Sequence, residues 1–148
     1  MAEHGTLPPG TAAPDTEFVR LDNQQRMRLA DLRGKVVVLD FWAVWCGGCQ
    51  GVLEKMQQYQ EQYPGWKQRV RVVPVSIDES LEAARDHLTK RGWTNTFNVW
   101  APGGHDSATV KAYRLNGIPM SYIIDSRGII VQAGRLLDIP EIVNGLLK

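Results

Sequence analysis

Residues 36–49 of this chain read VVVLDFWAVWCGGC, an apolar run that leads directly into two closely spaced cysteines. Unbroken apolar runs rich in β-branched residues are typical of strands buried inside a parallel sheet. A single carboxylate, Asp40, interrupts this run. After Cys49 the apolar residues recur with helical spacing until a Pro-Gly pair at 64–65 ends the pattern. The sequence therefore predicts a buried strand and a following helix, with Cys46 and Cys49 at their junction.

The junction of a strand and a helix gives the two cysteines a specific chemistry. The first turn of a helix carries unpaired N–H groups and the positive end of the helix dipole. A thiolate is stabilised there, so Cys46 is expected to act as a nucleophile at neutral pH. Cys49 lies one helical turn later, where it is placed to attack a mixed disulfide formed on Cys46. Gly47 and Gly48 between them keep bulky side chains out of a partner's way. The pattern predicts dithiol–disulfide exchange.

The same C-x-x-C spacing also forms half of a structural zinc site. A closed zinc site needs four ligands, commonly with a second Cys or His pair at similar spacing. The remaining candidates, His4, His87 and His105, are scattered singly through the chain. Haem attachment would need a histidine after the second cysteine, where this chain has Gln50. The sequence therefore favours a redox pair and predicts no metal ion and no cofactor beyond the disulfide itself.

Several motifs carry a resemblance to a known family. The segment Asp-Phe-Trp-Ala-x-Trp-Cys-Gly-x-Cys at 40–49 resembles the active-site segment of thioredoxins, which carry Cys-Gly-Pro-Cys. Other stretches, spread over about residues 12–135, are similar to the TlpA/ResA-like branch of the thioredoxin-like superfamily, which shares features with the AhpC/TSA peroxiredoxins. These stretches are Ala13-Pro14-Asp15, Leu29-Ala30-Asp31-Leu32-Arg33-Gly34-Lys35, Val75-Ser76-Ile77-Asp78 and Gly117-Ile118-Pro119.

The resemblance implies an α/β, thioredoxin-like fold with a central mixed β-sheet, helices on both faces and an N-terminal β-hairpin. We assign residues 15–148 to this domain. Residues 1–14, rich in Gly, Pro, Thr and Ala, are expected to form a flexible lead or linker. Pro74 falls inside an expected strand, so an irregularity is expected there because proline removes a ladder donor. The other expected elements are strands at 17–21, 27–29, 70–77, 120–125 and 129–133 and helices at 81–91, 107–115 and from 138.

Asp40 occupies the position at which thioredoxins also carry an acid. The resemblance implies that its carboxylate accepts the proton of Cys49 when that thiol attacks. Alternatively, burial merely keeps the acid protonated, the acid is paired with a lysine elsewhere, or its strand is less deeply buried than the pattern predicts. Two departures from the family pattern stand nearby: Gly48 replaces the thioredoxin proline, and Val52 stands where ResA-like proteins tend to have glutamate.

Pro119 lies at the position of the cis-proline that faces the dithiol in the thioredoxin superfamily. The resemblance implies that the backbone of Ile118 pairs with an extended segment of the partner, as a short β-augmentation. Trp42 and Trp45, together with Gly47 and Gly48, are expected to shape the docking surface around it. The alternative is that Pro119 simply opens a strand.

The expected function is that of an enzyme, a thiol-disulfide oxidoreductase acting more as a protein-disulfide reductase. Its partners would be protein thiols and disulfides and an upstream dithiol electron donor, and the chain is expected to be a monomer. A peroxiredoxin-type thiol peroxidase is one alternative, although the Pro-x-x-x-Thr-x-x-Cys pattern of that class is absent before Cys46. A non-catalytic thioredoxin-fold binding module and a zinc module are the others.

Composition and charge limit the classes of binding partner and the cellular locations to be considered. A net charge of +1 with interspersed charges gives no reason to expect nucleic-acid binding. No apolar stretch approaches 18 residues, so no membrane span is expected in this chain. The family resemblance implies an extracytoplasmic or periplasmic location, with a tethered precursor. A cytoplasmic location is the alternative, because no signal-peptide pattern is visible at the start.

Overall fold

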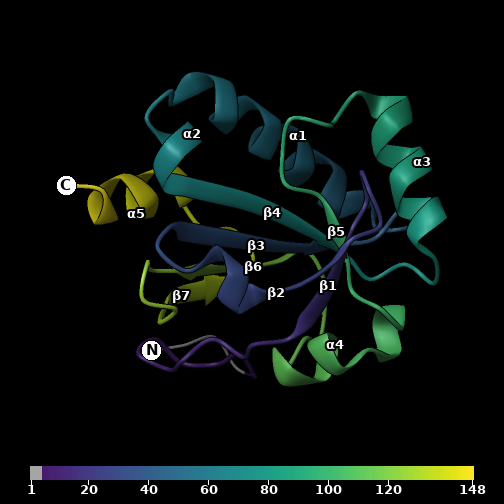
Figure 1. Ribbon diagram of the computed structural model, residues 1–148, viewed down its shortest axis with the longest axis horizontal. Coiled ribbons are helices and arrows are strands. Elements are labelled where there is room, and N and C mark those ends of the chain that lie inside the picture. Colours follow the sequence, from purple (N-terminus) through teal and green to yellow (C-terminus); the bar gives the residue numbers. More distant parts are fainter. Residues whose placement is uncertain (1–4) are drawn as a thin grey trace.

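The computed structural model describes residues 5–148, and within them the centre is a seven-stranded sheet with the order β2-β1-β5-β4-β3-β6-β7 (Figure 1). The three central strands β3, β4 and β5 run parallel, and all other neighbours pair antiparallel. The expected mixed sheet is therefore confirmed. The strands are β1 (Glu17–Arg20), β2 (Arg26–Arg28), β3 (Val36–Trp42), β4 (Val70–Ser76), β5 (Val99–Trp100), β6 (Met120–Ile124) and β7 (Ile130–Gly134).

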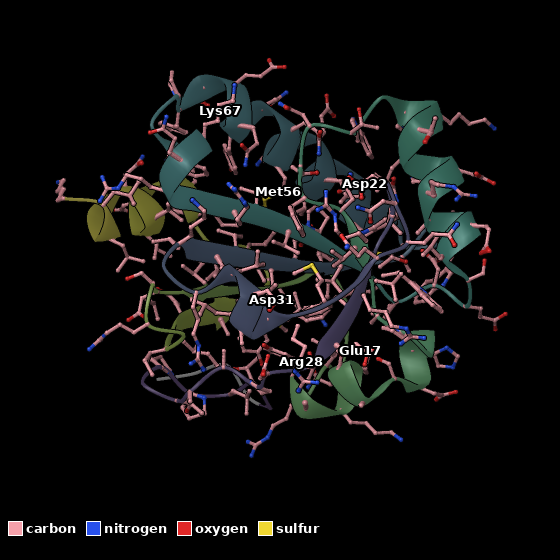
Figure 2. The ribbon with its side chains drawn as sticks, in the orientation of Figure 1. Glu17, Asp22, Arg28, Asp31, Met56 and Lys67 are labelled. Atoms are coloured by element: carbon pink, nitrogen blue, oxygen red, sulfur yellow. A yellow bond between two sulfur atoms is a disulfide. The ribbon has the colours of Figure 1, made fainter. Side chains whose placement is uncertain are left out.

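Helices cover both faces of this sheet, as expected for the fold class (Figure 1). One face is covered by α1 and the helices that pack beside it, and α4 lies on the opposite face. The helices are α1 (Gly47–Gln62), α2 (Trp66–Arg69), α3 (Leu81–Arg91), α4 (Ala108–Ala112) and α5 (Ile139–Leu146), with short 3-10 turns at Leu29–Leu32 and Gly104–Asp106. Charged side chains such as Lys67 point outward, whereas Met56 points inward from α1 (Figure 2).

Strand β3 is the axis of the core, and all seven of its residues are buried. Successive side chains of a strand point to opposite faces of the sheet. Val38 packs in one cluster with Met56 of α1, whereas Phe41 contacts the ring of Tyr113, which follows α4, at 5.5 Å between centroids. Asp40 shares the face of Val38, so the strand directs this carboxylate toward the underside of α1.

Strand β4 shows no irregularity at Pro74, contrary to the expectation. Its seven residues pair in continuous parallel register with β3. The reason lies in the alternation of backbone groups along a strand. Val72 and Ser76 direct their carbonyls toward the β5 side, so Pro74, which lies between them, also turns its missing N–H to that side. Only two residues of β4 pair with β5, and Pro74 is not one of them.

The segment before β1 corrects the expectation of a flexible lead over residues 1–14. Residues 1–4 lie outside the described part of the chain. Residues 5–14 pack against the domain: Leu7 is buried, its N–H donates to the Tyr122 hydroxyl at 3.1 Å, and a backbone bridge joins the segment to the residue before β7. The expectation is therefore wrong for residues 5–14. The expected hairpin after it is confirmed, because β1 and β2 pair antiparallel.

Candidate active site

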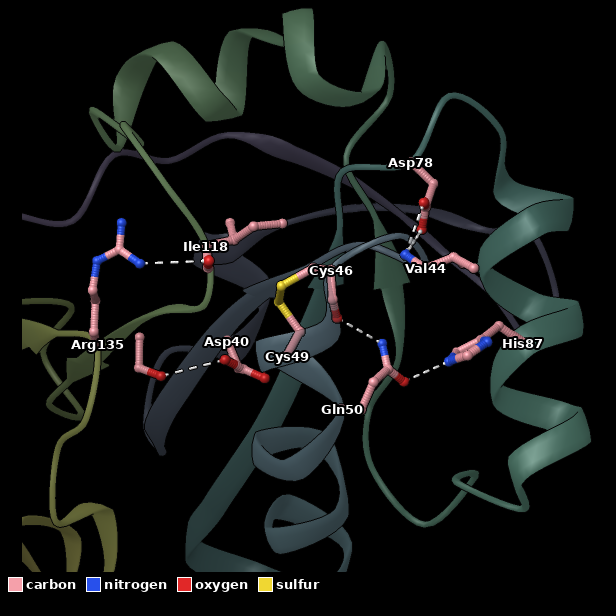
Figure 3. The surroundings of a disulfide bond; sticks show 10 residues. Asp40, Val44, Cys46, Cys49, Gln50, Asp78, His87, Ile118 and Arg135 are labelled. Atoms are coloured by element: carbon pink, nitrogen blue, oxygen red, sulfur yellow. Dashed lines mark hydrogen bonds between the residues drawn. A yellow bond between two sulfur atoms is a disulfide. The ribbon is translucent and has the colours of Figure 1, made fainter.

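The dithiol lies where the sequence predicts it, between the end of β3 and the start of α1 (Figure 3). Cys46 is the residue that precedes α1, Cys49 lies in its first turn, and the two form a disulfide with 5.4 Å between their Cα atoms. The N–H of Cys46 donates to the carbonyl of Ala43 at 3.1 Å, which closes the connecting turn. The short connection from strand to helix therefore fixes both sulfurs at the carboxyl edge of the parallel strands.

The two cysteines differ in accessibility. Cys49 is fully buried, whereas Cys46 retains 8% exposure and is followed by the exposed Gly47 and Gly48. Trp45, directly before Cys46, is 69% exposed and is thus one of the few large apolar side chains at the surface of residues 5–148. An incoming partner therefore reaches the sulfur of Cys46 first, and Cys49 is shielded from it.

Asp40 is a fully buried carboxyl group whose side chain points toward the dithiol (Figure 3). The Ser121 hydroxyl donates to its Oδ1 at 3.4 Å, and its Oδ2 has no hydrogen-bond partner among the described residues. Burial raises the pKa of Asp40 to about 8, against the smaller lowering effect of the Ser121 bond. No lysine pairs with it among the residues that the structure describes. The acid is therefore ready to exchange a proton near neutral pH.

A second loop completes the surface around Cys46. The Ile118–Pro119 peptide bond is cis, as expected from the family resemblance, and both residues are half-buried. A β-carbon built on Gly48 would lie 3.7 Å from Cδ of Pro119, so this loop and the dithiol turn are in contact. The structure thus brings together five of the residues predicted to form the docking surface: Trp45, Gly47, Gly48, Ile118 and Pro119.

The structure contradicts the prediction that Trp42 helps to form the docking surface. Its side chain is completely buried, because it is the last residue of the central strand and lies under the helices. Its ring packs against the imidazole of His87 on α3, with 5.7 Å between centroids. Trp42 therefore packs beneath the site, and its buried side chain cannot contact a partner.

A chain of hydrogen bonds from Cys46 to α3 is absent from the sequence predictions. Gln50 donates through Nε2 to the carbonyl of Cys46 at 3.0 Å, and its Oε1 lies 2.7 Å from Nε2 of His87 (Figure 3). This pairing requires the imidazole to carry its proton on Nε2. Burial, assisted by the charge of Arg91, lowers the pKa of His87 and so favours the neutral ring. The spacing of Gln50, four residues after Cys46, is the one signal that could have indicated part of this arrangement.

Asp78 holds the loop on the other side of Cys46. Its buried carboxylate accepts hydrogen bonds from the N–H of Val44 at 3.0 Å and from the hydroxyl of Ser76 at 2.7 Å. Both Ser76 and Asp78 belong to the motif Val75-Ser76-Ile77-Asp78, which carried the family resemblance without an assigned role. The contacts explain the motif, because they fix the backbone two residues before the reactive cysteine.

The described residues contain neither a metal-ligand grouping nor a membrane-spanning helix. Across residues 5–148, no three His, Cys, Asp or Glu side chains gather where they could hold a metal ion. Within the same residues, none of the helices has the length and apolar character needed to cross a bilayer.

Comparison with known proteins gives the same assignment as the geometry. The profile of the thioredoxin-like family matches residues 34–130. The thiol-disulfide oxidoreductase ResA of Oceanobacillus iheyensis is 31% identical over 143 residues, which cover 93% of this chain and 66% of that protein. The thioredoxin-like protein YneN of Bacillus subtilis is 30% identical over 122 residues, covering 82% of this chain and 68% of that one. The chain thus spans about two thirds of the length of these relatives.

Solved structures agree with these relatives. The thioredoxin domain of a thiol-disulfide oxidoreductase from Bacteroides vulgatus superposes with a TM-score of 0.81 at 20% identity, covering 94% of this chain and all of that domain, which shows the shared fold. A protein from Chlorobium tepidum assigned as thiol:disulfide interchange protein DsbE has a TM-score of 0.77 at 29% identity, with 96% of each chain covered. The chain therefore belongs to the thioredoxin-like family, and its relatives place it among the thiol-disulfide oxidoreductases of the ResA type.

Proposed function

We propose that this oxidoreductase reduces disulfides in protein partners through its Cys-Gly-Gly-Cys dithiol. In the reduced protein, the Cys46 thiolate attacks one sulfur of the partner disulfide. A bond forms between Cys46 and that sulfur, the partner S–S bond breaks, and the other partner sulfur leaves as a thiolate that takes a proton from water. Cys49 then gives its proton to Asp40 and attacks the Cys46 sulfur. The internal disulfide forms, the second partner sulfur leaves, and the partner has gained two electrons.

The observation that carries this proposal is the buried carboxyl of Asp40 on the face of β3 that looks toward α1. A general base works best when its pKa lies near that of the group it deprotonates and near the working pH. An ordinary thiol has a pKa of about 8.5, and burial raises the pKa of Asp40 to about 8. Asp40 is therefore far better matched to a thiol than an ordinary carboxylate is, and it is suited to accept the proton of Cys49. Cys49 itself is shielded from water, so the carboxylate supplies the proton acceptor that solvent does not.

The surroundings of the dithiol support the direction of electron flow. A strong oxidant of this chemistry is one whose reduced form is stabilised. Burial raises the pKa of Asp40 to about 8, so near pH 7 this acid is mostly neutral and supplies no positive charge that would stabilise a thiolate of the reduced dithiol. A dithiol without such stabilisation gives up its electrons more readily, which is the property of a reductase.

Partners and location belong to the same proposal. An upstream dithiol donor would restore the reduced form, and the disulfide would be the only redox group required. The likeness to ResA and to the TlpA/ResA-like branch supports an extracytoplasmic location, with the chain acting as a monomer.

Reduction of insulin disulfides in the presence of a dithiol donor tests this function. We expect turnover by the wild-type chain, none by Cys46→Ser, and a stable mixed disulfide with the partner in Cys49→Ser. Asp40→Asn is expected to form the mixed disulfide at the normal rate but to resolve it slowly, since only the second step uses the carboxylate. The matched control is Asp86→Asn, because Asp86 is exposed on α3. Equal resolution rates in the two Asn variants would contradict the role of Asp40.

A further inference from the structure

The side chain of Arg135 lies over the loop that contacts the dithiol turn (Figure 3). Arg135 is the first residue after β7, and its Nη1 lies 3.5 Å from the carbonyl oxygen of Ile118, to which it donates. A β-carbon built on Gly117 would collide with Nη2 of the same guanidinium. The φ angle of Gly117 is not among the positive ones, so the backbone itself does not require glycine there. The missing side chain instead leaves the space that the guanidinium occupies.

Arg135 carries a charge that the described part of the chain leaves uncompensated. Ion pairs within 4.0 Å join several arginines of residues 5–148 to carboxylates, but none includes Arg135. The residue is exposed, and the protein atom to which it donates is a neutral carbonyl oxygen. Guanidinium groups bind carboxylates far more strongly than carbonyls, because two parallel charge-assisted hydrogen bonds form at once. Among the described residues, this arginine is thus a cation without a carboxylate partner, and it lies on the loop that contacts the dithiol turn.

The position of Arg135 matters for the partner because it lies where the partner chain must pass. A segment that pairs with the backbone of Ile118 needs the carbonyl that Arg135 contacts. Two large apolar side chains that are exposed among residues 5–148 are sequence neighbours of the residues discussed here. Trp45 directly precedes Cys46, and Leu136 directly follows Arg135. Binding of a partner therefore displaces or shares the guanidinium. A carboxylate on the partner offers it a better acceptor than the one it leaves.

We infer that Arg135 selects partner segments that carry an Asp or Glu beside the reacting cysteine. This inference rests on the proposed exchange with protein partners and names the class of segment preferred. Arg135 contacts Ile118, in the loop that touches the dithiol turn, and residues of an extended chain are spaced by about 3.3 Å. We therefore expect the preferred carboxylate within one or two residues of the partner cysteine. The contact is exposed to solvent, where ion pairs are weak. We therefore expect a preference of about two- to five-fold over a neutral segment, decreasing at high salt.

The test uses the full chain with Cys49→Ser, so that the reaction stops at the mixed disulfide. Two peptides, one with Asp and one with Asn on both sides of a single cysteine, are each supplied as a disulfide with 2-mercaptoethanol, a neutral leaving group. The rate of formation of the peptide–protein disulfide is measured for each, and the ratio of the two rates is compared between variants. Any effect of Arg135 on the reactivity of Cys46 itself cancels in this ratio.

Arg135→Ala is expected to lower the Asp-to-Asn ratio by about two- to five-fold, and Arg135→Glu to lower it further, because the charge at this position is removed or reversed. Arg135→Lys should retain part of the preference, since it keeps the charge without the planar fork. The matched control is Arg69→Ala: Arg69 is exposed on α2, which leads into the opposite end of β4 from the dithiol. The preference should also vanish in about 1 M salt, where the screening length is about 3 Å.

Two different failures can be told apart. An unchanged ratio in both Arg135→Ala and Arg135→Glu would overturn the role of Arg135 while leaving the proposed exchange intact. Failure of Cys46 to react with either peptide, and with 2-hydroxyethyl disulfide, would instead overturn the proposed function and this inference with it. Thermal unfolding of each variant verifies that the exposed substitutions leave the fold unchanged.

Discussion

Asp40→Asn gives the clearest energetic test of the buried acid, because burial sets the direction of the effect and its approximate size. Burial raises the pKa of Asp40 from an ordinary value of 3.8 to about 8. Between these values the folded chain keeps a proton that the unfolded chain releases, so the stability that this group contributes is complete below about pH 4 and is lost as the pH rises toward 8. Each pH unit costs about 1.36 kcal/mol. From pH 5 to pH 7.5 the wild-type chain should therefore lose about 3 kcal/mol, and the Asn variant should not.

The assay is urea unfolding of the oxidised protein, followed by tryptophan fluorescence at about pH 5 and about pH 7.5. The oxidised form is chosen because Cys49 then has no proton to exchange with the acid. All other titrating groups are common to both proteins, so the difference in unfolding free energy between variant and wild type isolates Asp40. Asp86→Asn serves as the exposed control and should show no pH-dependent difference. If the Asp40→Asn difference changes by less than about 1 kcal/mol between the two pH values, Asp40 is ionised in the folded protein and burial does not raise its pKa as proposed.

Two further changes follow from contacts of the site. Ser121→Ala removes the hydrogen bond that opposes the effect of burial, so the pKa of Asp40 should move further upward. The pH midpoint for resolution of the mixed disulfide should then shift upward too, and an unshifted midpoint would mean that the bond does not act on the carboxylate. Gly48→Pro places proline in the first turn of α1, where a β-carbon at this position would lie 3.7 Å from Cδ of Pro119, an ordinary contact distance. Because proline reduces the freedom of the unfolded chain, we expect a gain of about 0.4–1 kcal/mol in urea unfolding, and a loss would show that the turn needs glycine.

The dithiol and the acid beside it are predictable from the sequence for a local reason. The apolar run, Asp40 and both cysteines fall within a stretch that forms one strand, one turn and the start of one helix. Alternation along that strand is sufficient to place the carboxylate on the face toward α1. The parallel centre of the sheet follows from the same continuous apolar patterning.

The parts that the sequence does not predict depend on distant contacts. The hydroxyl of Tyr122 accepts a hydrogen bond from the N–H of Leu7, 115 residues away in sequence. This contact and others like it attach the N-terminal segment to the domain, although its composition predicts a flexible lead. His87 approaches Gln50 only because α3 packs beside α1. Trp42 lies in the motif next to the cysteines, and a large aromatic side chain there suggests a docking residue. Its place at the end of the central strand buries it instead.

Arg135 shows the same limit at the site itself. Nothing in its local sequence distinguishes it from the other surface arginines. Its proximity to Ile118 arises because β6 and β7 pair antiparallel, which returns the end of β7 to the start of β6. Glycine at position 117 is one sequence feature that fits this contact, and it is interpretable only once the structure is known.

The reduction potential of the Cys46–Cys49 pair distinguishes a disulfide reductase from an oxidant. The oxidised and reduced chains are equilibrated in dithiothreitol or glutathione buffers of known ratio, and the fraction of disulfide is counted by thiol alkylation. A reductase should show a single two-electron transition near or below the thioredoxin value of about −270 mV. A transition near the strongly oxidising value of about −120 mV would contradict the proposed direction, and the absence of any two-electron transition would contradict the redox function itself.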